Sequence, residues 1–307
     1  QLPILNAMMK IFYAFTCFLT LICAHALAVN NPKQYMIRAD SLYRQSQFDS
    51  ALYYYQAALK MLEPRDTAQK VEIRNDISSI YLRTRQFDLA KPFLEETQQL
   101  AELNLSSTHP EMAHLYNQLG RYSWFHGQYA KGLEYLYTAK TVYTVNEMEN
   151  PELLMTIYAN LGFAHGFGGG IDSSVFYFNE SVALAKNLEN PLKLADRLSD
   201  LSFAYTQKGD YESALDVMQQ SLEINKKHLP ANHASIGKNY NNLTYITIEH
   251  WDHDLAIRYA NEALKIIEQN EGLQSYSAAI AYMNLAAAYG NKEEWNNLLA
   301  NAEKAEA

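Results

Sequence analysis

Beyond its N-terminal segment, this 307-residue chain distributes hydrophobic and polar positions with the period of amphipathic helices. Within residues 153–166, Leu154, Tyr158 and Leu161 recur at the i, i+4, i+7 spacing that places side chains on one helix face. Residues 211–222 show a similar spacing after a short turn. The pattern therefore predicts pairs of amphipathic α-helices joined by short turns.

The helix pairs recur at an even interval, which indicates an internal repeat. An anchor residue, usually aromatic, follows each predicted turn, and a small residue usually stands three positions later. Successive anchors lie 39 to 42 residues apart, a regularity that ordinary secondary structure does not produce over such a length. The anchors are Phe48, Phe87, Tyr129, Ile171, Tyr211, His253 and Trp295. The expected repeat units are 32–65, 66–106, 109–148, 151–188, 191–229, 232–271 and 274–307.

Residue types at the expected helix starts agree with this division. Proline is favoured in the first turn of a helix, where its missing N–H would have no partner anyway. Four prolines stand where the first helix of a unit is expected to begin: Pro32, Pro110, Pro151 and Pro191. Acidic residues, which the helix dipole favours near an N-terminus, follow five of the anchors: Asp49, Asp88, Asp172, Glu212 and Asp254.

The units resemble tetratricopeptide (TPR) repeats. The fifth unit carries Leu201-Ser202, Tyr205, the turn Gly209-Asp210-Tyr211 and then Ala214, which is the order of residues typical of that family. The resemblance covers roughly residues 32–307. It implies an all-α fold, namely a right-handed α–α superhelix of about seven helix-turn-helix repeats, in one TPR domain over residues 29–307.

The length of the repeat is similar to that of the kinesin-light-chain type of TPR, because the period is near 42 residues rather than about 34. That type often carries His-Pro before the first helix and Asn-Leu within it. Corresponding pairs occur here at His109-Pro110, Asn160-Leu161, Asn242-Leu243 and Asn284-Leu285.

The first 28 residues are predicted to be a signal peptide. Lys10 precedes an apolar run over residues 11–23, and Ala26-Leu27-Ala28 has the form of a signal peptidase site. The run is shorter than the ~20 residues that span a bilayer, although an uncleaved membrane anchor remains the alternative. We therefore expect the repeats to be exported, to a periplasmic or extracellular location. Membrane attachment is expected only through an uncleaved segment.

Composition and charge argue against several classes of function. With 25 Lys and Arg against 34 Asp and Glu, the formal charge is −9, so a nucleic-acid partner is not expected. Cys17 and Cys23 are the only cysteines, so the repeats contain no thiol nucleophile and no thiolate metal ligand. The chain has none of the common hydrolase, metalloprotease or phosphate-loop motifs. We expect a protein that is not an enzyme and that has no cofactor and no metal.

Two segments that superficially suggest ligand sites are better explained by the repeat. The glycines within residues 166–170 fall at the turn of the fourth unit and lack the Lys of a phosphate loop. His250 and His253 lie close together, but His253 occupies an anchor position, so we expect it to pack at the turn rather than to bind a metal.

The resemblance places the first helix of each unit on the concave surface of the superhelix. Asn side chains recur there next to the Leu that repeats in successive units, and aromatic residues follow shortly after it. In the kinesin-light-chain type such Asn residues bond the backbone of an extended peptide, and an Asn amide can both donate and accept. The candidate peptide-binding residues are Asn117, Gln118, Arg121, Trp124, Asn160, Phe163, Phe203, Asn241, Asn242, Tyr245 and Asn284. Alternatively, the Asn residues are ordinary surface residues and the aromatic residues pack between units.

The expected function is that of an exported scaffold that binds a peptide or protein partner. Arrays of this kind also resemble the sensory halves of longer bacterial proteins. The alternative hypothesis is therefore that the repeats are the regulatory N-terminal region of a longer signalling or protease protein. Its output would be a histidine kinase, a DNA-binding regulator or a CHAT protease. A third reading is end-to-end self-association through the open ends of the repeat array.

Overall fold

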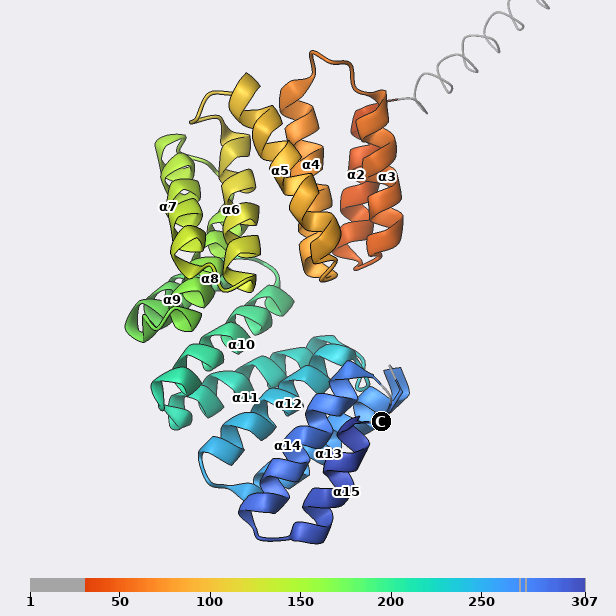
Figure 1. Cartoon of the computed structure of the whole chain (residues 1–307), viewed down its shortest axis with the longest axis vertical. Coiled ribbons are helices and arrows are strands. Elements are labelled where there is room, and N and C mark those ends of the chain that lie inside the picture. Colours follow the sequence, from red (N-terminus) through yellow and green to blue (C-terminus); the bar gives the residue numbers. More distant parts are fainter. Residues whose placement is uncertain (1–30, 271, 274, 307) are drawn as a thin grey trace, which may run out of the picture. The chain divides into compact units, whose positions relative to one another are not determined.

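The computed structural model describes residues 31–270, 272–273 and 275–306, so the expected signal peptide at 1–28 lies outside the described residues. Every element in the described ranges is an α-helix, and there are fourteen (Figure 1). The first helices of the pairs are α2 (Pro32–Arg44), α4 (Thr67–Arg83), α6 (Pro110–Phe125), α8 (Pro151–Phe167), α10 (Pro191–Lys208), α12 (Ala234–Glu249) and α14 (Tyr276–Asn291). The second helices are α3 (Phe48–Met61), α5 (Phe87–Asn104), α7 (Tyr129–Val145), α9 (Ile171–Lys186), α11 (Tyr211–His228), α13 (His253–Asn270) and α15 (Trp295–Glu306).

The helix starts follow the sequence signals closely. All seven anchors are the first residue of a second helix, and the four prolines are each the first residue of a first helix. Asn31, Asn150 and Asn190 cap three of these starts, because each side-chain oxygen accepts a backbone N–H bond from within the first turn. The prediction of an all-α fold built from helix pairs is confirmed.

The chain divides into two compact units, which are described separately. The first unit contains residues up to 122 together with 141–148, and the second contains 123–140 and 149–307. Helices α2 to α5 therefore belong to the first unit, helices α8 to α15 belong to the second, and α6 and α7 contribute to both.

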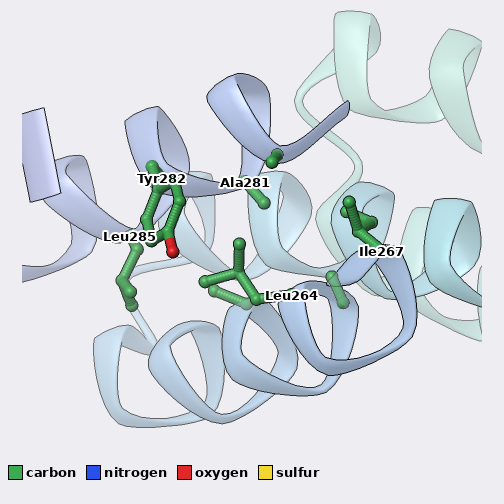
Figure 2. Close-up of a cluster of buried hydrophobic side chains, with 8 residues drawn as sticks. Leu264, Ile267, Ala281, Tyr282 and Leu285 are labelled. Atoms are coloured by element: carbon green, nitrogen blue, oxygen red, sulfur yellow. The ribbon is translucent and has the colours of Figure 1, made fainter. Parts of the chain in front are cut away.

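Successive repeats are held together by apolar contacts between the second helix of one repeat and the first helix of the next. Between the sixth and seventh repeats, Leu264 and Ile267 of α13 pack with Tyr282 and Leu285 of α14 (Figure 2). Ala281 of α14 is fully buried in the same cluster, where its small side chain allows the helices to approach closely. A single pair has no such partner for its outer face, so burial of this apolar surface requires stacking.

Ion pairs recur at the turns between repeats in the second unit. Lys208 at the end of α10 pairs with Asp172 near the start of α9 at 2.9 Å, and Lys292 pairs with Asp254 of α13 in the same relation at 2.7 Å. These pairs are exposed at the acidic positions that follow the anchors, so each contributes little to stability. The two ion pairs are therefore a result of the repeated helix arrangement and do not determine it.

None of the helices in the described part of the chain is both long and apolar enough to cross a membrane.

Gly162 lies at the closest approach of the two helices in the fourth repeat. A Cβ atom at this position would lie 2.8 Å from the ring of Phe178, which is fully buried on α9. The Ser174 hydroxyl of α9 donates a 2.8 Å hydrogen bond to the Gly162 carbonyl oxygen, which shows how near the two backbones come. The structure therefore explains why this position carries no side chain.

Replacement of Gly162 by Leu is expected to lower the free energy of unfolding by about 1–3 kcal/mol or more, because the added side chain overpacks this contact. Thermal melting followed by circular dichroism measures the effect. The matched control is Ala183→Leu on the exposed side of α9, which introduces the same side chain where there is room. Equal melting temperatures for the two variants would contradict the assigned contact.

Candidate binding surface

The first helices of neighbouring repeats lie side by side within each unit. In the first unit, the Tyr43 and Ser79 hydroxyls join α2 to α4 at 2.9 Å. In the second unit, Phe163 of α8 lies against Phe203 of α10, with ring centroids 5.7 Å apart. Helices α12 and α14 are also in contact. Side chains of successive first helices therefore share a surface in each unit, which we call the first-helix face.

Three predicted aromatic residues come together on the first-helix face of the second unit. Trp124 of α6 stacks on Phe163 of α8, with centroids 5.0 Å apart and an interplanar angle of 17°. Phe203 of α10 completes the contact. Two residues that the sequence analysis did not single out belong to the same cluster: Phe125 stacks on Trp124 at 4.1 Å, and Phe167 lies 5.0 Å from Phe203. These five residues form what we call the aromatic stack.

Part of the aromatic stack remains accessible. Phe167 is 47% exposed and Phe125 is 36% exposed, whereas Trp124 is only 8% exposed. Aromatic rings with one covered and one open side can accept an apolar or aromatic side chain from a ligand with little loss of conformational entropy. The stack thus both packs between repeats and presents rings to a partner.

The predicted polar residues differ in how far they are buried. Asn117 and Asn160 are 2% and 5% exposed and already take part in interactions within the protein, as does Arg121. Asn242 is partly exposed and donates a 3.2 Å hydrogen bond to the Ser199 hydroxyl, which links α12 to α10. Asn284 is also partly exposed. Among the predicted asparagines, those that a ligand can reach directly are therefore Asn242 and Asn284.

Tyr245 is the most accessible of the predicted residues, because 45% of its surface is exposed on α12. Partial burial and the nearby carboxylate of Glu249 raise the pKa of its hydroxyl, so it remains a neutral donor at ordinary pH. Asp200, at the equivalent of the Asn242 position, instead pairs with Arg197 at 3.2 Å. The first-helix face is therefore not a uniform row of amides.

Several buried polar atoms on the first helices have no hydrogen-bond partner within the described protein. They include Asn75 Oδ1 on α4, Gln118 Oε1 and Trp124 Nε1 on α6, Arg197 Nε on α10 and Asn241 Oδ1 on α12. A buried polar group without a partner costs about 1–3 kcal/mol, so such groups are uncommon and call for an explanation. Three of these five atoms are amide oxygens, which need a donor such as a backbone N–H.

The first unit contains an acidic cluster that the sequence analysis missed. Four partly buried carboxylates interact electrostatically across α2, α4 and α6, and we call them the acidic cluster: Asp40, Glu72, Asp76 and Glu111. Burial, reinforced by the like charges of its neighbours, raises the pKa of Asp76 well above its usual range. Burial also raises the pKa values of Glu72 and Glu111.

The repeat register could have revealed this cluster. Asp76 stands two residues before Ser78, as Gln118 stands two residues before Gly120 in the next unit. Glu72 lies one helical turn earlier on the same face of α4. The sequence signal is therefore the presence of charged residues at register positions that carry asparagine, glutamine or aromatic residues in other units.

The two segments that the sequence analysis explained by the repeat lie at turns. Residues 168–170 connect α8 to α9, and Gly169 has the left-handed backbone conformation that such a turn requires, with φ of 87°. His253 begins α13 and contacts the Trp251 ring edge-on, with centroids 5.7 Å apart.

Comparisons with known proteins agree with the repeat type. Residues 194–235 match the family model described as tetratricopeptide repeat. None of the curated proteins compared with the chain matches it. A Podosopora anserina kinesin light chain with nearly identical TPR-like repeats has a similar structure, at 18% identity and a TM-score of 0.55, over 64% of this chain and 95% of that one.

Two further solved structures cover more of this chain. NprR in complex with its cognate peptide NprX is 14% identical, with a TM-score of 0.63 over 89% of this chain and 77% of that one. A signal transduction ATPase with a tetratricopeptide repeat sensor, from Pyrococcus horikoshii, is 17% identical, with a TM-score of 0.63 over 90% of this chain and 42% of that one. The chain thus carries a tetratricopeptide repeat and has the fold of TPR-like helical solenoids, as the sequence predicted.

Replacement of Asp76 by Asn is expected to stabilise the protein near neutral pH, by on the order of 1 kcal/mol, because it removes a buried charge among like charges. The raised pKa means that the folded state holds this proton more tightly than the unfolded state does. The penalty in the wild type therefore develops as the pH rises above the ordinary Asp pKa of about 3.9, and the gain in the variant vanishes below it.

Chemical denaturation at several pH values measures this difference. Asp216→Asn on the exposed face of α11 is the matched control and is expected to have little effect. If Asp76→Asn destabilised the protein near neutral pH, the carboxylate would have a stabilising partner and the description of the cluster would be wrong.

Proposed function

We propose that this protein is an exported interaction scaffold that binds an extended peptide, or a flexible segment of a protein, on the first-helix face. The binding would involve no chemical step. An extended segment carries backbone N–H and C=O groups at regular intervals, and it can satisfy side-chain amides that lie at a repeating position on successive helices.

The observation that carries this proposal is the set of buried amide oxygens without partners on α4, α6 and α12. Asn75 and Asn241 occupy equivalent positions, three residues before Ser78 and Thr244 respectively, and Gln118 lies one position further along its helix. Two of the three oxygens, one in each unit, therefore stand at the same repeat position. A ligand that lies along the first helices would contact such a position in each unit.

The aromatic stack gives the proposed surface an apolar component. Trp124 Nε1 is a buried donor without a partner, next to the exposed rings of Phe125 and Phe167. A peptide could place an apolar side chain against these rings and a backbone carbonyl oxygen near the indole N–H. NprR, a neighbour in fold, was solved with a bound peptide, which supports the same kind of ligand here.

Export is the proposed location of this scaffold. The proposal rests on the charged start, the short apolar run and the Ala26-Leu27-Ala28 site in the N-terminal segment. Retention of that segment would attach the repeats to a membrane. End-to-end self-association of the array remains a possible further property. The negative charge of the chain argues against nucleic acid as a partner.

A second candidate function is that of a sensor region within a longer signalling protein. One neighbour in fold has a tetratricopeptide repeat sensor in a signal transduction ATPase, and this chain covers 42% of that protein. Sequencing the reading frame beyond Ala307 tests this candidate. A kinase, protease or DNA-binding domain in the same frame would support it, and an immediate stop codon would favour the stand-alone scaffold.

The triple variant Asn241→Ala/Asn242→Ala/Asn284→Ala is expected to bind peptides from a library of short extended sequences at least about tenfold more weakly than the wild type. Each lost hydrogen bond costs roughly 0.5–1.5 kcal/mol, so three together give such a loss. Fluorescence polarisation with labelled library peptides measures the affinity.

The matched control removes three exposed asparagines from second helices, Asn104, Asn179 and Asn261, each of which bonds only the carbonyl oxygen four residues earlier. Melting curves of both triple variants show whether each is folded. Equal binding by the wild type and by a folded triple variant of α12 and α14 would contradict the proposed surface.

A further inference from the structure

We propose that the acidic cluster of the first unit receives the positively charged side chain of a Lys or Arg residue in the bound peptide. This inference rests on the proposed function and adds the chemistry of the partner. It is independent of the aromatic stack, which lies in the other unit.

Hydrogen bonds from neighbouring helices hold two members of the acidic cluster. The Tyr55 hydroxyl of α3 donates a 2.6 Å hydrogen bond to Asp40 Oδ1 of α2. Asn75 of α4 donates to the backbone oxygen of Glu111 at 3.1 Å and to Glu111 Oε2 at 3.2 Å, which joins α4 to α6. Asp76 follows Asn75 directly and interacts electrostatically with both Asp40 and Glu111, as Glu72 also does.

No Lys or Arg among the described residues forms an ion pair with any member of the acidic cluster. Arg74, which stands two residues from both Glu72 and Asp76 in the sequence, contacts the second helix α5 instead. Its guanidinium donates to Glu96 Oε2 and to Thr97 Oγ1, each at 2.8 Å, and lies 4.1 Å from the centre of the Phe93 ring. Other acidic residues in the chain have cationic partners, for example Asp172 and Asp254.

Asn75 gives a second and independent indication of a missing donor. This side chain is 3% exposed, and its nitrogen is committed to two oxygen atoms of Glu111, which fixes the orientation of the amide. Its oxygen, Oδ1, is buried and has no hydrogen-bond partner. The amide that binds the Glu111 carboxylate therefore also carries an acceptor that lacks a donor.

The carboxylates of the acidic cluster and Asn75 Oδ1 are acceptors that a basic side chain can supply with donors. Carboxylates and amide oxygens only accept, the Tyr55 hydroxyl is already used on Asp40, and an ammonium or guanidinium group offers three or five N–H donors respectively. The peptide's own basic residue is the occupant that this chemistry favours.

The protonation of the cluster gives the binding a pH dependence. The groups that face one another are Asp40 of α2, Tyr55 of α3, Glu72 and Asp76 of α4, and Glu111 beside His109 at the start of α6. Burial and like charges raise the pKa values of Asp76 and Glu72 in the free protein. Burial also raises the pKa of Glu111, where the Asn75 hydrogen bond and His109 partly oppose it. A bound cation lowers these pKa values, so binding releases protons and strengthens as the pH rises.

The test compares peptides from the library that bind the full chain with matched peptides in which each Lys is acetylated and each Arg is replaced by citrulline. The wild type is expected to bind the basic peptides at least about tenfold more tightly, as expected for a charge-assisted bond in a desolvated site. The preference should increase between roughly pH 5 and pH 8, a range in which Lys and Arg remain charged.

Asp76→Asn is expected to lose most of this preference while remaining folded, and Asp216→Asn on α11 is expected to keep it. Equal affinity of the wild type for basic and neutralised peptides would overturn the inference and leave the proposed function standing. Absence of binding to any library peptide would overturn both. Free spermidine provides a further control. If it displaced a labelled basic peptide as strongly as the unlabelled peptide does, a peptide would not be the source of the positive charge.

Discussion

The structure depends on the burial of each helix pair against the next repeat. One pair has apolar side chains on more sides than it can cover itself, and the contact of Leu264 and Ile267 with Tyr282 and Leu285 shows how the neighbouring repeat covers them. This apolar burial is not directional, and it takes place where the second helix of one repeat packs against the first helix of the next. The first-helix face carries, in addition, polar and aromatic groups that this packing does not itself require.

Those groups distinguish this protein from a simple stack of helices. The partnerless oxygens of Asn75 and Asn241 and the carboxylate of Asp76 each lower stability in the free protein. Proteins retain such costs mainly where function needs them. In our account, peptide binding within each unit offsets these costs. Backbone N–H groups supply donors to the amides, and in the first unit a basic side chain lies in the acidic cluster.

The sequence predicted the helices well because their boundaries are set by local chemistry. Proline at Pro151 starts a first helix, and the anchor Ile171 starts a second helix even though it is not aromatic. The contact of Phe163 with Phe203 was also predictable, since both residues stand two positions after the recurring Leu of their units. Trp124 lies three positions beyond the equivalent Arg121, so its place in the cluster was not given by the repeat. Burial depth was not predictable in this way. Asn160 is 5% exposed because its helix is covered by neighbours whose side-chain positions no periodicity specifies. The acidic cluster likewise depends on contacts between residues from three repeats.

The central claim is that the first helices, and not the second helices, contact the ligand. Hydrogen–deuterium exchange of the full chain, with and without a peptide selected from the library, measures this most directly, because bound segments open less often. The account predicts added protection in first helices, including α4 and α12, with α5, α9 and α13 unchanged. Protection confined to the second helices, or spread equally over both sets, would contradict it.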